Sequence, residues 1–200
     1  MRPRQSLLAA GPFESLAPLG VRGGHRLESH LSETRLTSMA DTTDIPTLRR
    51  LLHDCRRIAV VGISAEWHRP SYFVGKYLLE HGYTMIPVNP KYAEVLGQKC
   101  YPDVLTAAKE AGPIDMVDCF RRSADIEPLA EDAIAIGAKC LWMQLGVSNE
   151  PAAQHARAAG LDVVQDRCVK IEHGRLFGGL NWAGVNTRVI SSKRPRQLPY

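Results

Sequence analysis

The sequence lacks any apolar run that approaches the ~18 residues needed to cross a lipid bilayer. Its five cysteines form no Cys-x-x-Cys pair and no Cys/His set with the spacing of zinc ligands. We therefore expect neither a membrane protein nor a metal site, and the odd number of cysteines predicts free thiols in a reducing, cytoplasmic compartment. Hydrophobic residues make up 44% and charged residues 23% of the 200 residues, which is typical of one globular domain.

The formal net charge is +4, but the basic residues are concentrated at the two ends of the chain. Residues 1–38 contain five Arg and three Glu, and residues 188–200 contain four basic residues and no acid. The remaining stretch, 39–187, is therefore slightly acidic, which does not suit a nucleic-acid groove. We expect no nucleic-acid partner.

Residues 1–38 show no helical or strand periodicity, so we interpret them as a disordered or mis-assigned leader, with Met39 as an alternative start. An organellar transit peptide is the alternative, although three Glu residues count against it. Residues 188–200 are interpreted as a solvated basic tail.

From residue 45 onward, short apolar runs alternate with amphipathic stretches. Strands are predicted at 58–61, 83–88, 114–120, 140–145 and 161–165, and helices at 45–55, 71–80, 101–110, 124–136 and 150–159. This alternation predicts an α/β fold: a single Rossmann-like domain over residues 39–187 with a doubly wound, mainly parallel sheet. The continuous apolarity of 58–61 agrees, because central parallel strands are covered on both faces.

The loop after the first predicted strand, 62–71, is a candidate phosphate site. In an open parallel sheet, ligands bind beyond the carboxyl ends of the strands. This loop leads to a helix N-terminus with Ser71 expected at the cap, where exposed amides and the helix dipole favour a phosphate. Its single glycine, Gly62, matches neither the dinucleotide fingerprint nor a P-loop, so an ordinary strand-to-helix turn is the competing interpretation.

Asn89, Pro90 and Lys91 follow the second predicted strand, where enzymes that use NAD place an acidic residue. A cation at this position suits a phosphate on the adenosine ribose, either the 2′-phosphate of NADP or the 3′-phosphate of coenzyme A. A solvated loop lysine is the alternative. After the third predicted strand, Arg121 or Arg122 could hold a pyrophosphate through forked hydrogen bonds.

No nucleophile, base and orienting acid can be assembled from the sequence, so we predict no catalytic residue. Trp67, His68 and Trp142 are interpreted as packing or lid residues. Cys168 follows a predicted strand beside Arg167, whose charge would lower the pKa of the thiol. An inert thiol is the competing interpretation.

These features together resemble the CoA-binding domain family, small proteins similar to the nucleotide-binding half of the succinyl-CoA synthetase α subunit. The resemblance runs from about residue 45 to residue 192. It is carried by Val61-Gly-Ile-Ser64, Arg69-Pro-Ser71, Ile86-Pro-Val-Asn-Pro-Lys91, Ile114-Asp-Met-Val-Asp-Cys-Phe-Arg-Arg-Ser123, Leu141-Trp-Met-Gln-Leu-Gly146, Asp166-Arg-Cys168 and Phe177-Gly-Gly-Leu-Asn181. It implies a Rossmann-like domain that binds coenzyme A.

The resemblance also implies the residues that contact the ligand. The phosphates would be contacted by Gly62, Ile63, Ser64, Arg69, Pro70 and Ser71, and the adenosine end by Asn89, Pro90 and Lys91. The rest of the ligand would be contacted by Phe120, Arg121, Met143, Gln144, Leu145 and Gly146. The synthetase also uses a phosphorylated histidine on a second domain, which we do not expect here, so ligase activity is not implied.

The first hypothesis is a protein that binds coenzyme A or an acyl-CoA without evident catalysis of its own. One alternative is an NADP-dependent oxidoreductase in which Lys91 binds the 2′-phosphate, against which the missing glycine fingerprint counts. The other alternative is acyl or thiol transfer at Cys168.

Overall fold

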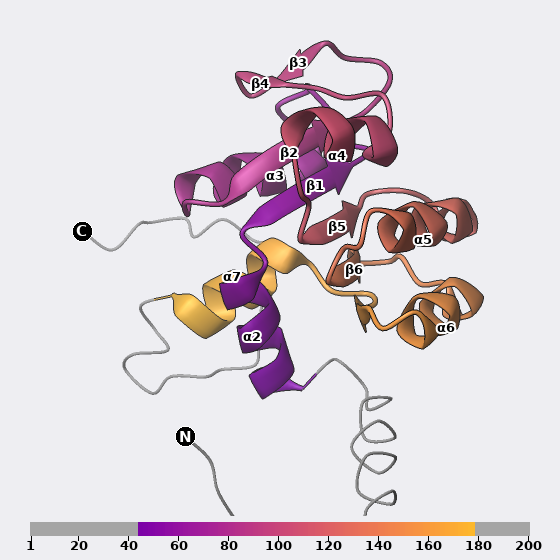
Figure 1. Cartoon of the computed structure of the whole chain (residues 1–200). Coiled ribbons are helices and arrows are strands. Elements are labelled where there is room, and N and C mark those ends of the chain that lie inside the picture. The colour runs from indigo at the N-terminus through magenta and orange to yellow at the C-terminus, as the bar shows by residue number, and fades with distance from the viewer. Residues whose placement is uncertain (1–43, 179–200) are drawn as a thin grey trace, which may run out of the picture. The chain divides into compact units, whose positions relative to one another are not determined.

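Five parallel strands form the central sheet of the computed structural model, which describes residues 44–178 (Figure 1). The strands are β1 (Arg57–Val61), β2 (Thr84–Val88), β5 (Met116–Cys119), β6 (Cys140–Met143) and β7 (Asp162–Val164). They lie in the order β2-β1-β5-β6-β7, and every pairing between them is parallel. The predicted α/β, Rossmann-like fold is confirmed. The interpretations of residues 1–38 and 188–200 concern segments outside the described residues.

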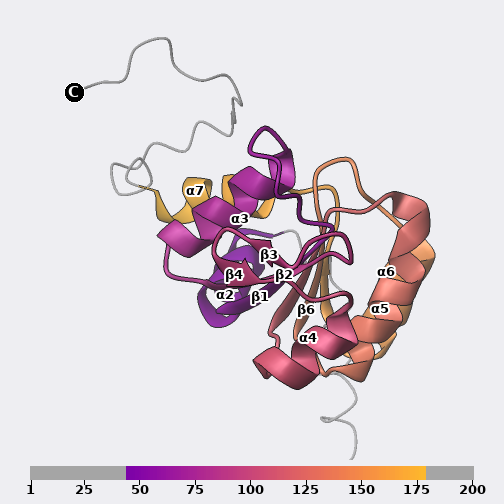
Figure 2. The same cartoon turned by 90° about the horizontal axis from the view of Figure 1, so that it is seen from above.

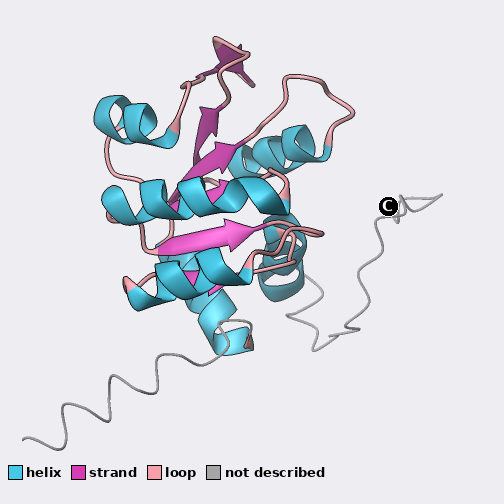
Figure 3. Cartoon of the chain, turned by 90° about the vertical axis from the view of Figure 1, so that its right-hand side faces the viewer, coloured by secondary structure: helices cyan, strands magenta, loops and turns pink. Residues whose placement is uncertain are grey.

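Three helices cover each face of this sheet (Figures 2 and 3). One face carries α2 (Ile45–Asp54), α3 (Pro70–Glu80) and α7 (Val169–Phe177), and the other carries α4 (Val104–Ala111), α5 (Ile126–Ala135) and α6 (Glu150–Ala158). Leu48, Leu78 and Leu176 pack on the first face, and Ala107 and Ala153 pack on the second. Both faces of the sheet are thus covered, which explains the continuous apolarity of β1.

Polar side chains fix the first turns of several helices. The Asp44 carboxylate accepts a hydrogen bond from the Thr47 amide (3.0 Å) at the start of α2. The Asp103 carboxylate accepts one from the Thr106 amide (2.7 Å) at the start of α4. Helix α3 differs, because its cap residue is Arg69 and no side chain caps its first turn. The expectation that Ser71 forms this cap is therefore wrong.

Several elements were not predicted from the sequence. A two-stranded antiparallel hairpin, β3 (Glu94–Val95) and β4 (Gln98–Lys99), follows β2, and a 3₁₀ turn, η2 (Ser123–Asp125), precedes α5. Helix α7 was also missed. In addition, β6 ends at Met143 and not at residue 145, so Gln144 and Leu145 belong to the loop at the carboxyl edge of the sheet.

The chain changes direction across the sheet at β1. It runs from β1 through α3 to β2 on one side, then returns through α4 to β5 on the other side of β1. In open α/β sheets, such a switch point leaves a crevice between the two diverging connections, and ligands bind there. None of the helices in residues 44–178 combines the length and the apolarity of a membrane-spanning segment.

Candidate functional site

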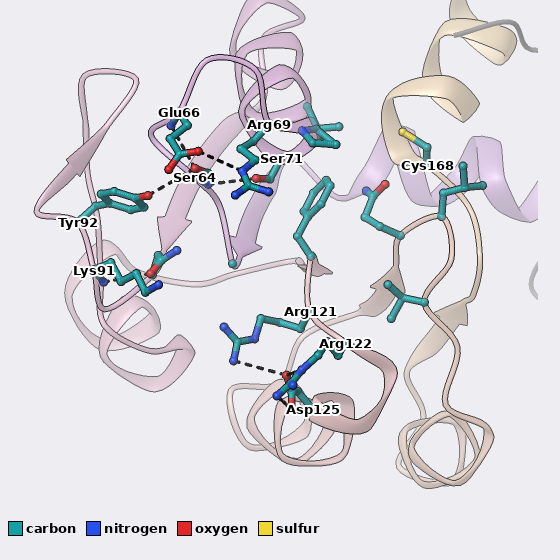
Figure 4. A pocket seen from close by; sticks show the side chains of 18 of the residues that line it. Ser64, Glu66, Arg69, Ser71, Lys91, Tyr92, Arg121, Arg122, Asp125 and Cys168 are labelled. Atoms are coloured by element: carbon teal, nitrogen blue, oxygen red, sulfur yellow. Dashed lines mark hydrogen bonds and ion pairs between the residues drawn. The ribbon is translucent and has the colours of Figure 1, made fainter.

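A pocket of about 990 Å³ lies at the carboxyl ends of the strands, and residues that follow each of the five strands contribute to it (Figure 4). Its lining consists of Gly62, Ser64, Glu66, Arg69, Pro70, Ser71, Val74, Asn89, Pro90, Lys91, Tyr92, Phe120, Arg121, Arg122, Asp125, Gln144, Leu145, Val147, Cys168 and Ile171. This is the edge at which the sequence predicts a ligand.

Gly62 allows the loop after β1 to pass close to the end of β5. Its φ is +83°, and a Cβ atom at this position would lie 2.4 Å from the carbonyl oxygen of Phe120. The loop then folds back on α3, where the Ser64 amide donates a hydrogen bond to the Ser71 hydroxyl (3.1 Å). Among the described residues, no side chain caps α3. Pro70 has no N–H, and the amides of Tyr72 and Phe73 donate to the Arg69 carbonyl (3.1 and 3.3 Å), so the Ser71 amide and the helix dipole are what the first turn offers to an anion.

Asn89 joins the loops that follow β1 and β2. Its side-chain amide donates to the Ile63 carbonyl (2.7 Å), and its side-chain oxygen accepts from the Lys91 amide (3.0 Å). The Tyr92 hydroxyl lies 3.4 Å from the Ser64 hydroxyl, which adds a second contact between these loops. The Lys91 backbone is thereby fixed at the rim of the pocket, while its side chain is exposed (Figure 4).

The arginines of the pocket lining form ion pairs with carboxylates, whereas Lys91 does not among the described residues. Each arginine of the lining pairs with a carboxylate of the lining: Arg69 with Glu66 (3.1 Å), Arg121 with Asp125 (3.6 Å) and Arg122 with Asp125 (3.1 Å). Arg122 lowers the pKa of the Asp125 carboxyl through its hydrogen bond. Within the described part of the chain, the ammonium of Lys91 has no carboxylate partner, so it is available to a ligand.

The end of the pocket near β6 and β7 is mainly apolar, with lining from Phe120, Leu145, Val147 and Ile171. Figure 4 places Cys168 at this end, opposite Lys91. Burial raises the pKa of the Cys168 thiol, and Arg167 binds Glu172 (3.2 Å). The prediction that Arg167 lowers this pKa is therefore wrong.

A family model described as CoA binding domain matches residues 56–174, which include the whole lining of the pocket. The protein belongs to the CoA-binding domain family. The family resemblance seen in the sequence is thus confirmed.

This CoA-binding domain aligns with nearly the whole length of the relatives described below. The uncharacterized protein YneT of Bacillus subtilis (strain 168) is 39% identical over 127 residues, which cover 63% of this chain and 91% of YneT. A hypothetical protein from Pyrococcus horikoshii OT3 is 43% identical with a TM-score of 0.66, over 70% of this chain and 96% of that one. A Thermus thermophilus protein is 31% identical with a TM-score of 0.63, over 68% and 100%.

The pocket of this CoA-binding domain contains most of the residues predicted to contact a ligand. These residues are Gly62, Ser64, Arg69, Pro70, Ser71, Asn89, Pro90, Lys91, Phe120, Arg121, Gln144 and Leu145. The side chains of Ile63 and Met143 are fully buried in the core, so these residues could offer a ligand only their backbone. Gly146 lies outside the lining, and its amide donates to Asp166 (2.6 Å).

Other lining residues were not singled out from the sequence: Glu66, Val74, Tyr92, Asp125, Val147 and Ile171. The spacing of Arg121 and Arg122 to Asp125, four and three residues, is a signal for an ion pair at a helix start that could have identified Asp125. Ile171 gave no such signal because its helix was not predicted.

In residues 44–178, no group of three or more His, Cys, Asp or Glu is placed to hold a metal ion.

Proposed function

We propose that this domain binds coenzyme A or an acyl-CoA along the carboxyl edge of its sheet, without catalysis of its own. The observation that carries the proposal is the gradient of polarity along the pocket. The end near β1 and β2 has Lys91 and the start of α3, which lack a carboxylate partner and a side-chain cap, respectively, among the described residues, and the end near β6 and β7 is mainly apolar. Coenzyme A has the same gradient, from a charged nucleotide to a long neutral arm that ends in a thiol.

The nucleotide is assigned to the β1 and β2 end. The first turn of α3 and the loop at Gly62 favour the diphosphate, because helix N-termini bind anions through free amides and the helix dipole. Lys91, at the end of β2, is assigned to the 3′-phosphate on the ribose. Asn89 supports both assignments because it holds the two loops together.

The arm is assigned to the apolar end. Neighbouring strands lie about 4.8 Å apart, so the three steps from β1 through β5 and β6 to β7 span ~14 Å. An extended pantetheine arm reaches across this distance.

The lining carboxylates, Glu66 and Asp125, are held in ion pairs with arginines, so neither is placed as a free general base.

Substitution of Lys91 tests this proposal. Lys91→Ala is expected to weaken coenzyme A about fivefold to a hundredfold, the range for loss of a charge-assisted hydrogen bond, and to weaken 3′-dephospho-coenzyme A less than about twofold. Calorimetric titration measures both dissociation constants. Lys76→Ala, which removes an exposed lysine of α3 outside the lining, is the control and should change neither constant.

Two results would count against the proposal. If Lys91→Ala weakens both ligands equally, Lys91 does not bind the 3′-phosphate. If the unsubstituted protein binds no coenzyme A, the proposed function is wrong.

The position of Cys168 in the lining favours a second candidate function, thiol exchange with a disulfide of coenzyme A. In this step the Cys168 thiol loses its proton and its sulfur attacks one sulfur of the disulfide. The S–S bond of the ligand breaks, a new S–S bond joins Cys168 to one coenzyme A, and the other leaves as a thiolate that takes up a proton.

The exchange predicts a mass increase of one coenzyme A, mapped to Cys168 and removed by reductant. Because burial raises the pKa of this thiol, the rate is expected to increase as the pH rises from 7 to 9. Cys168→Ser should show no adduct. Attachment at the buried Cys55, or no adduct at any pH, would rule out exchange at Cys168.

A further inference from the structure

Asp118 is a carboxyl group buried in the middle of the sheet. It lies in β5, between β1 and β6, and its exposure is 0%. One oxygen, Oδ1, accepts a hydrogen bond from the Gln144 side-chain amide (2.7 Å), and the other, Oδ2, has no partner among the described residues. A buried polar group without a partner is costly and calls for an explanation.

The register of the sheet connects Asp118 to the pocket. Asp118 pairs with Trp142 of β6, and side chains two residues apart in a strand point to the same face. Phe120 and Gln144, two residues beyond this pair, lie at the carboxyl edge, and both line the pocket. The Asp118–Gln144 hydrogen bond therefore runs from the core to the pocket wall.

Gln144 is itself 3% exposed, although it lines the pocket. Oδ1 of Asp118 accepts from the amide nitrogen of Gln144, and this contact turns Oε1 of Gln144 away from Asp118. No residue among those described, 44–178, donates a hydrogen bond to Oε1. The Asp118–Gln144 pair thus leaves one oriented acceptor without a protein donor.

The surroundings make this acceptor selective. The lining near Gln144 includes the apolar side chains of Phe120, Leu145, Val147 and Ile171. In such surroundings a hydrogen bond to a ligand gains strength, and an acceptor left without a donor is penalised. A ligand group that brings an N–H or S–H donor here is therefore favoured over a purely apolar group.

We propose that Gln144 Oε1 accepts a hydrogen bond from an N–H or S–H group of the pantetheine arm, and that Asp118 is the positioning residue that orients the Gln144 amide. This inference rests on the proposed binding of coenzyme A. It adds a polar recognition point for the arm, separate from the contacts to the nucleotide.

The test compares ligands that differ in the arm. Coenzyme A has the full arm, desulfo-coenzyme A lacks the sulfur, and adenosine 3′,5′-bisphosphate lacks the arm together with one phosphate of the diphosphate. Gln144→Met is expected to weaken coenzyme A about threefold to tenfold and to leave the bisphosphate within about twofold. Gln154→Met, which removes an exposed amide of α6 outside the lining, is the matched control.

Two variants of Asp118 test its positioning role. Asp118→Ala removes the acceptor that orients Gln144 and should reproduce the loss caused by Gln144→Met. Asp118→Asn retains a side-chain oxygen of similar size and should bind coenzyme A within about twofold of the original protein. Thermal unfolding of each variant shows whether it folds. If Asp118→Ala does not fold, the two single variants Gln144→Met and Asp118→Asn still test the inference.

The outcomes are distinct. Weakening of coenzyme A and desulfo-coenzyme A alike assigns the donor to an arm amide, and weakening of coenzyme A alone assigns it to the thiol. Unchanged affinity for coenzyme A, or equal weakening of the bisphosphate, overturns the inference. Failure of the unsubstituted protein to bind both coenzyme A and the bisphosphate would instead refute the proposed function.

Discussion

Gly62→Ala is expected to destabilise the domain by about 2–4 kcal/mol and to weaken the binding of coenzyme A. The φ of +83° at this position strains any residue with a Cβ, and the added atom would lie 2.4 Å from the Phe120 carbonyl oxygen. Because that oxygen belongs to the backbone at the end of β5, relief requires the ends of β1 and β5 to separate. The crevice that we assign to the diphosphate lies between these two ends.

Gly137→Ala separates the two causes of this loss. Its φ of +67° imposes similar strain, but a Cβ there would have no neighbour within 4 Å. We expect this variant to lose about 1–2 kcal/mol and to keep its affinity for coenzyme A. Urea unfolding measures the free energy of unfolding of both variants. Equal losses would show that the contact with Phe120 does not contribute.

Asp118→Asn is expected to change the pH dependence of stability. Burial raises the pKa of Asp118 to about 7 from an ordinary value of 3.8. Between these values the folded state holds a proton that the unfolded state has released, so this group lowers the free energy of unfolding as the pH rises from 4 to 7. The lost stability is roughly 4 kcal/mol above pH 7.

The asparagine variant has no charge to bury, so its stability relative to the original protein should increase between pH 4 and pH 8. The difference between the two proteins isolates Asp118, because the other titrating groups are common to both. Urea unfolding at several pH values measures this difference. A difference that does not vary with pH would show that Asp118 titrates normally.

The sequence predicts the alternation of strands and helices well because each strand is a short apolar run. Helix α7 was not predicted, for two physical reasons. Glu172 faces the core, where Arg167 and Arg175 neutralise it, and Gly174 lies in the helix interior. The β3–β4 hairpin was missed because Leu96, with a φ of 55°, occupies a turn position that usually takes Asn, Asp or Gly.

The site was predictable where it depends on topology. Lys91 and Arg121 follow strands that end at one edge, so the parallel sheet brings them to the same pocket. The side chains of Ile63 and Met143 lie within the same motifs, but they point into the core. The Asp118–Gln144 hydrogen bond was not predictable, because it depends on the register between β5 and β6.

Native mass spectrometry of the protein mixed with equal concentrations of coenzyme A, NADP and NAD shows which of these nucleotides the pocket binds. All three ligands carry an adenosine and a diphosphate, and coenzyme A alone among them brings the pantetheine arm that we assign to the apolar end of the pocket. We predict a complex whose added mass corresponds to one coenzyme A. A dominant complex with NADP or NAD would contradict this account.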